Sequence, residues 1–172
     1  RCHENLGNMY LAKKFYLKSI QLEPSNEKSW ESLILFFINQ KKYVKAEYYL
    51  SRALEINSDS TNLWKKSLEL NAINGKQERV RLSSNRLVEL GNSKSDIFIH
   101  LIDFFIEKKV WVNAYEFAEE AVSSFPKNRN LALRLAGCYL NLSRTEEGLN
   151  LLNPNSLNAS EKTSFIKLFP NY

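Results

Sequence analysis

The sequence predicts an all-α protein made of helical hairpins that repeat along the chain. Segment 33–54 recurs as segment 101–122, at a shift of 68, with nine identities in 22 positions. Half of that shift, 34, separates Trp30 from Trp64 and Trp64 from Phe98. The chain is 44% hydrophobic and contains only five glycines and four prolines in 172 residues. A fixed period of this length in a chain with few helix breakers indicates an array of helical repeats.

Each repeat is expected to fold as two antiparallel helices. In the repeat that begins at residue 27, Trp30, Leu33 and Phe37 have the i, i+3, i+7 spacing that lines one face of a helix. After a turn, Ala46 and Ala53 mark a second helix, and their small side chains suit the place where the two helices cross most closely. Neither helix buries its apolar stripe alone, so stacking of neighbouring repeats must complete the core.

The period divides the chain into segments. We expect a partial repeat at 1–26, repeats at 27–60, 61–94 and 95–128, a truncated repeat at 129–153 and a capping segment at 154–172. The corresponding helices are predicted near 9–22, 27–39, 43–56, 61–73, 77–90, 130–142 and 144–152. A short helix at 160–169 would cover the last apolar face with Phe165, Ile166 and Phe169. Because the chain starts at Arg1, inside a repeat, we expect further repeats upstream.

At these residues the chain resembles the tetratricopeptide repeat family. The family motif has a large apolar residue at position 4, followed by Leu, small, aromatic, small, aromatic, Ala and Pro. The repeat at 27 offers Trp30, Leu33, Phe37, Ala46, Leu50 and Ala53, with Ser58 in place of the proline; the repeat at 95 offers Phe98, Leu101, Phe105, Ala114, Ala118, Ala121 and Pro126. The resemblance implies a right-handed α-solenoid and a scaffold that binds proteins.

The repeat at 61–94 departs from the motif. Ser67, Asn71, Val80 and Ser84 stand where Leu, an aromatic residue, a small residue and an aromatic residue are expected. We therefore expect looser packing in this degenerate repeat.

The resemblance also implies that the first helices line a concave groove, with repeat positions 2, 5, 6, 9 and 12 directed into it. The predicted partner-binding residues are Lys65, Lys66, Glu69, Ile99, His100, Asp103, Leu133 and Arg134. Charges of both signs mix here with aliphatic side chains, which suits a peptide or an amphipathic helix of a partner protein. One branch of the family grips acidic C-terminal peptides through a five-residue clamp. Only Lys65 and Arg134 match that clamp, and Glu69 would repel carboxylates.

A second candidate surface lies at the hairpin turns. Basic residues recur there at repeat positions 14 to 16: Lys41, Lys42, Lys76, Lys108, Lys109 and Arg144. With a net charge of +5, the edge that they would form is a candidate site for an acidic partner or nucleic acid. The alternative is that turns simply favour lysine. An RNA-processing assembly module of the half-tetratricopeptide type, and self-association into a homo-oligomer, are the two other functions that the sequence leaves open.

Nothing in the sequence indicates catalysis, and we expect no cofactor. Asp96, His100 and Asp103 share a helix face, but a metal site needs more ligands than a chain with two His and two Cys provides, and a solvated face is the preferred interpretation. Cys2 and Cys138 lie on distant repeats, so we expect no disulfide and a reducing, cytoplasmic location, with nuclear and periplasmic locations left open. The sequence also lacks an apolar run long enough to predict a transmembrane helix.

Overall fold

A computed structural model describes residues 9–152 together with Thr163 and Phe169, and residues 9–152 form helices joined by short turns. The helices are α2 (Met9–Leu22), α3 (Glu27–Asn39), α4 (Tyr43–Ile56), α5 (Thr61–Ile73), α6 (Gln77–Glu89), α7 (Lys94–Glu107), α8 (Trp111–Ser124), α9 (Arg129–Asn141) and α10 (Thr145–Leu152). The seven helices with predicted bounds agree with them within one residue, and α7 and α8 form the hairpin of the repeat predicted at 95–128. The predicted helix at 160–169 lies largely outside the described residues. None of the described helices is long and apolar enough to span a membrane.

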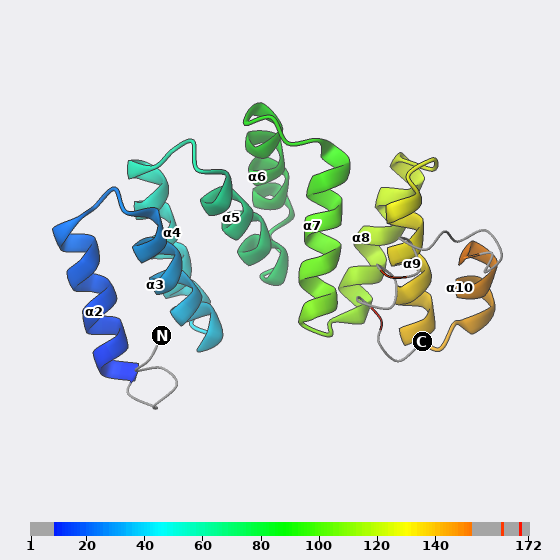
Figure 1. The fold of residues 1–172 in the computed structure, drawn as a ribbon, viewed down its shortest axis with the longest axis horizontal. Helices are drawn as coiled ribbons and strands as arrows, with labels where there is room; N and C mark the ends of the chain where they lie inside the picture. Colours follow the sequence, from blue (N-terminus) through cyan, green and yellow to red (C-terminus); the bar gives the residue numbers. More distant parts are fainter. Residues whose placement is uncertain (1–8, 153–162, 164–168, 170–172) are drawn as a thin grey trace. The chain divides into compact units, whose positions relative to one another are not determined.

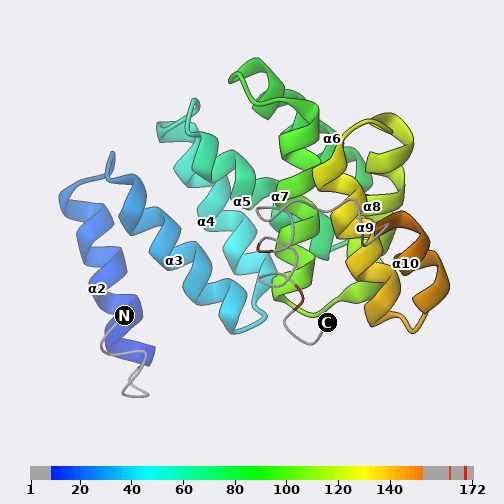
Figure 2. The same ribbon diagram turned by 45° about the vertical axis from the view of Figure 1, so that its right-hand side comes forward.

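The chain divides into two compact units, Arg1–Gly91 and Asn92–Tyr172. In the first unit each helix from α2 to α6 packs against the next one, and α3 also packs against α5 (Figure 1). In the second unit α7 to α10 pack in the same sequence, and α7 also contacts α9 (Figure 2). Within each unit the first helices of neighbouring hairpins therefore lie side by side. We call the surface formed by α3 and α5 the first-helix face of the first unit. The surface formed by α7 and α9 is the first-helix face of the second unit.

Polar side chains fix the start of the first helix in each hairpin from α3 onward. Each accepts a hydrogen bond from a backbone N–H of the first turn, which would otherwise lack a partner. These N-cap residues are Asn26, Ser60, Ser93 and Asn128. The caps explain why α9 begins at residue 129, one residue before the predicted start.

The turns within the hairpins repeat the same backbone conformation once per repeat. Lys41, Gly75, Lys109 and Ser143 have φ angles of 57°, 65°, 57° and 62°. This left-handed conformation suits glycine and is unfavourable for side chains with a Cβ atom. The period in the sequence is therefore also a period in the backbone, although only Gly75 is the residue type that the turn favours.

We expect Lys109→Gly to raise the free energy of unfolding by about 0.5–1 kcal/mol, because glycine adopts the left-handed turn without strain. Gly75→Ala should lower it by about 1 kcal/mol for the converse reason. Urea denaturation of the variants measures both changes. Lys108→Gly is the matched control. Lys108 has an ordinary φ of −83°, so this substitution should lower the free energy of unfolding. Equal effects at 108 and 109 would contradict this account.

Stacked aromatic rings form the centre of the two strong hairpins. Phe37 stacks on Tyr49 with 5.2 Å between ring centroids and an interplanar angle of 3°. Phe105, the equivalent residue of the later segment, stacks on Phe117 at 5.6 Å and 11°. In each case the preceding phenylalanine meets the stack edge-on, with its ring centroid 5.3 Å from that of Phe37 or Phe105. The sequence identity of the two segments thus corresponds to the same packing in both units.

The tryptophans that revealed the period tie each hairpin to the preceding loop. The Trp30 indole N–H donates to the carbonyl oxygen of Pro24, and that of Trp64 donates to the carbonyl of Ser58, both at 2.7 Å. Phe98 has no such donor, and its ring instead packs edge-on to Phe125 at 6.3 Å. The large ring at repeat position 4 therefore contacts the preceding loop in two repeats and the end of its own hairpin in the third.

The degenerate repeat has a buried polar cluster at its centre. The Ser67 and Ser83 hydroxyls lie 3.0 Å apart, and the Asn71 amide donates to Ser67 at 3.2 Å. Ser83 also donates to the carbonyl of Arg79 at 2.9 Å. Because these buried groups hydrogen-bond to one another, the loss of the expected apolar residues does not leave these hydroxyls unpaired. Helix α5 packs on α6 as the first helices of other repeats pack on their second helices.

Candidate functional site

A hydrogen bond connects the two helices of the first-helix face in the first unit, and an ion pair lies on α5. The Asn62 amide on α5 donates to the Glu27 carboxylate on α3 at 3.0 Å. On α5 itself, the Lys66 ammonium group donates to both oxygens of Glu69, at 2.9 and 2.8 Å. Glu69 is only 3% exposed. Its charge is balanced by Lys66, so the repulsion of carboxylates predicted for Glu69 is weakened here.

Glu31 lies on α3 of the same face and is half-buried. Burial raises the pKa of its carboxyl group, neighbouring Glu27 raises it further, and Lys66 and Lys28 oppose the shift. Lys65, which was predicted to contact a partner, is partly exposed. This face therefore presents a mixed polar surface on which both signs of charge are already close together.

An ion pair dominates the first-helix face of the second unit. The Arg134 guanidinium group on α9 donates to both carboxylate oxygens of Asp103 on α7, each at 2.7 Å. It also donates to the backbone carbonyl of Asn130 at 3.1 Å. The Arg134 side chain is only 14% exposed. The two-pronged contact holds α7 and α9 together, so Arg134 is not the unpaired cation that a carboxylate clamp needs.

Of the other residues predicted on this face, Ile99 and His100 are partly exposed on α7. Leu133 on α9 is buried, with 5% exposure.

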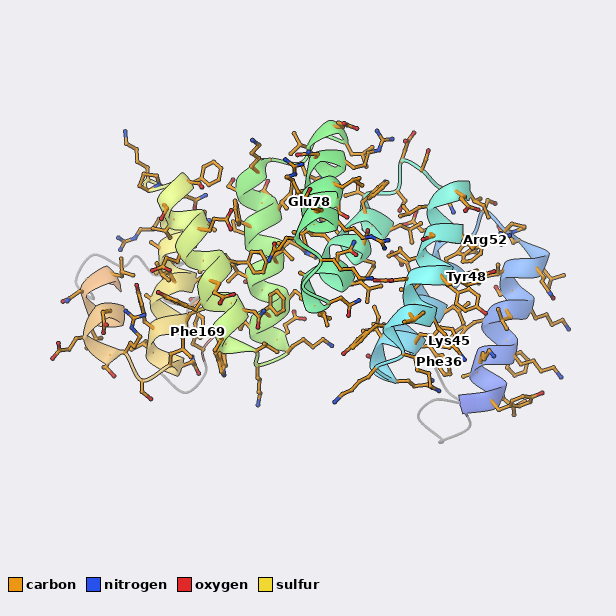
Figure 3. The ribbon with its side chains drawn as sticks, turned by 180° about the vertical axis from the view of Figure 1, so that it is seen from behind. Phe36, Lys45, Tyr48, Arg52, Glu78 and Phe169 are labelled. Carbon is orange, nitrogen blue, oxygen red and sulfur yellow. The ribbon has the colours of Figure 1, made fainter. Side chains whose placement is uncertain are left out.

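The same face also holds a side chain from outside the hairpins. Phe169 is 2% exposed, although it lies well beyond Leu152, where α10 ends. Its ring fills the space where Gly137 of α9 lacks a side chain, and it lies 6.1 Å from the ring of Trp111 at the start of α8 (Figure 3). The expected cap placed Phe169 over the end of the last hairpin. The structure places it on α9 and beside α8 instead.

The predicted basic edge forms a hollow in the first unit. A space of about 570 Å³ lies between the α3–α4 and α5–α6 turns, with lysines around it. These lysines are Lys41, Lys42, Lys45 and Lys76, and Glu47 and Asn74 also line the space. Glu47 pairs with Lys76 and accepts a hydrogen bond from Asn74 at 3.1 Å. Lys45, which projects from α4 (Figure 3), was not among the residues predicted for the basic edge.

In the second unit the basic residues do not act alike. Lys108 and Lys109 are exposed at the α7–α8 turn. The guanidinium carbon of Arg144 lies 4.4 Å from the ring centroid of Tyr139 and 5.4 Å from that of Tyr115. Arg144 also pairs with Glu147 at 3.1 Å. Its cation–π contacts hold the α9–α10 turn against α8, so Arg144 serves the local structure.

Within the described residues, no group of three or more His, Cys, Asp and Glu side chains is placed to hold a metal ion. Asp103 of the Asp96, His100 and Asp103 set binds Arg134 instead. Cys138 is a free, buried thiol on α9. Burial raises its pKa from 9.0 to about 12, while nearby Arg134 opposes the shift and Asp103 adds to it. The thiol is therefore protonated at neutral pH.

We expect this thiol to make stability depend on alkaline pH. The thiol ionises near pH 9 in the unfolded chain but only near pH 12 in the folded protein. Its contribution to stability is therefore fully present below pH 9 and is lost as the pH rises from 9 towards 12. Between roughly pH 8.5 and 10, the free energy of unfolding of the wild-type protein should fall by about 1 kcal/mol more than that of Cys138→Ala. Urea denaturation at a series of pH values measures the difference. If the stability of the two proteins changed with pH in the same way, the pKa of Cys138 would be the same in the folded and unfolded states.

Comparison with known proteins relates the fold to solved structures. No family model matches the sequence, and no curated protein matches it. The crystal structure of MamA superimposes with a TM-score of 0.56 at 14% identity, covering 99% of this chain and 95% of that one. YrrB, described as a TPR protein with an unusual peptide-binding site, gives 0.51 at 13% identity, covering 99% and 83%. PilF of Pseudomonas aeruginosa gives 0.52 at 18% identity, covering 98% and 80%.

Proposed function

We propose, from the premise that this chain has the tetratricopeptide-repeat fold, that it is an interaction scaffold that holds a peptide or helix of a partner protein on its first-helix faces. The observation that carries the proposal is the position of Phe169. A side chain from outside the hairpins is buried against Gly137, at one of the repeat positions predicted to face the groove. The first-helix face of the second unit thus has a shape that accepts an added segment.

The charges of the two faces support a protein ligand over a polyanion. Acidic and basic side chains alternate on them, as in the Lys66–Glu69 and Asp103–Arg134 pairs. Paired charges of this kind leave little net field to attract nucleic acid, whereas backbone and side-chain groups of a peptide can use both signs. The proposed activity is binding.

Photo-crosslinking tests the proposal. A benzophenone amino acid is placed on the first-helix faces, at Lys65 or at Ile99, and as controls at the exposed positions Arg81 and Glu119 of the second helices. We expect a common protein adduct from 65 and 99 in cells that contain the full chain, identified by mass spectrometry. An adduct formed only at 81 or 119 would overturn the assignment to the first-helix faces.

The lysine hollow favours a second candidate function, the binding of an acidic ligand such as single-stranded RNA. Lys41, Lys42 and Lys45 come together there with one acidic neighbour, Glu47. We expect RNA affinity that falls with salt and is lost when Lys41, Lys42 and Lys45 are changed to Glu. Charge reversal at Lys13, Lys14 and Lys18 of α2 is the control. RNA binding that survives the first set of changes would exclude the lysine hollow.

A further inference from the structure

The backbone conformation of α9 does not require a glycine at position 137. It lies inside α9, where glycine is unfavourable, and it is not among the glycines with positive φ. A Cβ atom built on Gly137 would lie 2.1 Å from Cε2 and Cζ of Phe169 and 2.5 Å from Cδ2. These distances are far shorter than van der Waals contacts. The absence of a side chain at 137 is therefore what lets the aromatic ring lie on the helix.

The surroundings of the ring have the features of an aromatic pocket. Trp111 provides a second ring, tilted by 35° to that of Phe169. Leu133 lies about one turn before Gly137 on the same stripe of α9 and is 5% exposed, whereas the side chain of Leu140, about one turn after Gly137, packs towards Gly148 of α10. Gly137 thus forms the floor of an apolar stripe that is open to a flat ring and has a large indole beside it.

A polar contact lies next to this stripe and keeps it in place. Arg134 is three residues before Gly137 and therefore lies on the adjacent part of the same helix surface. Its two hydrogen bonds to Asp103 join α9 to α7. The helix that carries Gly137 is thereby fixed to its neighbour by a contact that does not involve Phe169.

We infer that the pocket at Gly137 and Trp111 is a receptor for an aromatic side chain of the partner peptide, and that Phe169 occupies it in the free protein as an internal competitor. This inference rests on the proposed function and specifies the chemistry of the partner. A side chain tethered to the same chain has a high effective concentration, so a partner must displace it. The apparent affinity for the partner is proportional to the fraction of protein whose pocket is empty, so removing Phe169 raises it.

The first experiment uses a fluorescent peptide of residues 163–172, TSFIKLFPNY, and measures fluorescence anisotropy with the full-length chain. We expect the peptide to bind the Phe169→Ala chain at least about 10-fold more tightly than wild type, because the tethered competitor is gone. Adding Gly137→Ala to Phe169→Ala should abolish binding, since its Cβ fills the floor of the pocket. The matched control is Val112→Ala, next to Trp111 and 57% exposed, which should behave as wild type.

Two variants of the peptide test its chemistry. Alanine in place of Phe169 should remove binding, and leucine should weaken it, because a branched side chain does not lie flat on the helix. Circular dichroism shows whether each protein variant is folded. Gly137→Ala favours the helix, so its loss of binding is not a loss of structure. Equal binding to wild type and Phe169→Ala, or binding unchanged by Gly137→Ala, would overturn the inference.

The second experiment asks whether foreign peptides use the same pocket. Short random peptides displayed on phage are selected on the Phe169→Ala chain. We expect selected peptides to share one aromatic position, to compete with TSFIKLFPNY and to bind wild type less tightly. Selected peptides without an aromatic position would overturn the inference. The proposed function is tested separately, by the crosslinks at Lys65 and Ile99, which do not depend on an aromatic residue in the partner.

Discussion

Replacing Phe37 by alanine is expected to lower the free energy of unfolding by about 3–5 kcal/mol, and Phe105→Ala should do the same. Both rings are 2% exposed and each stacks on an aromatic residue of the second helix, Tyr49 or Phe117. Truncation removes the buried area of a phenyl ring and leaves a cavity between the two helices of a hairpin. The stack itself adds about 0.5–1.5 kcal/mol beyond the area term.

Urea denaturation followed by circular dichroism measures these changes. Val44→Ala is the matched control in the first unit, because Val44 is 81% exposed on the same hairpin and should change stability by less than about 0.5 kcal/mol. Phe37→Leu separates ring stacking from burial, since it keeps much of the apolar volume. If Phe37→Ala were no worse than Val44→Ala, the stacked pair would not be the centre of the hairpin.

Enlarging the small residues at the helix crossings is expected to have the next largest effect. Ala53 on α4 and Ala121 on α8 have 0% exposure and occupy equivalent repeat positions. Leucine at either position has no space, because the facing helix lies where the new atoms would go. We expect Ala53→Leu and Ala121→Leu each to lower the free energy of unfolding by about 3 kcal/mol, since a packed core relaxes poorly around added volume.

The same substitution on the outside of each helix is the control. Ser51 and Ser123 are exposed and lie two positions from Ala53 and Ala121 in opposite directions. Ser51→Leu and Ser123→Leu should leave stability nearly unchanged, because helix propensity favours leucine slightly and no packed atom is displaced. Thermal unfolding gives the comparison. Tolerance of leucine at position 53 or 121 would show that the hairpin helices are further apart than their alanines indicate.

The repeat period predicted the helices well because it has a physical source at every level. The large ring at position 4 closes the junction with the preceding loop, as the hydrogen bonds of Trp30 and Trp64 show. The left-handed turn recurs once in each hairpin, as at Gly75. The degenerate repeat was expected to pack loosely. The repeat pattern does not reveal that the hydroxyls of Ser67 and Ser83 hydrogen-bond to each other across the hairpin, because such pairing depends on the position of both helices.

The candidate site was less predictable than the fold. Periodicity places Lys65, Asp103 and Arg134 on first helices, but it does not say which charges pair. The structure joins Arg134 to Asp103 and Lys66 to Glu69, so two predicted binding cations already have acidic partners. A signal for the pocket was present, since a glycine inside a helix pattern often has a packing reason. Its occupant could not be identified from the sequence.

The sequence by itself determined the all-α class, the hairpin repeat and most helix ends, because helix periodicity, caps and turns are local properties of a few successive residues. The tertiary structure alone decided that Phe169 lies against Gly137, that Arg134 is paired, and that Lys45 joins the lysines of two different turns in one hollow. These contacts link residues that are far apart in the chain, and they depend on how helices stack and how charges balance, which no local pattern encodes.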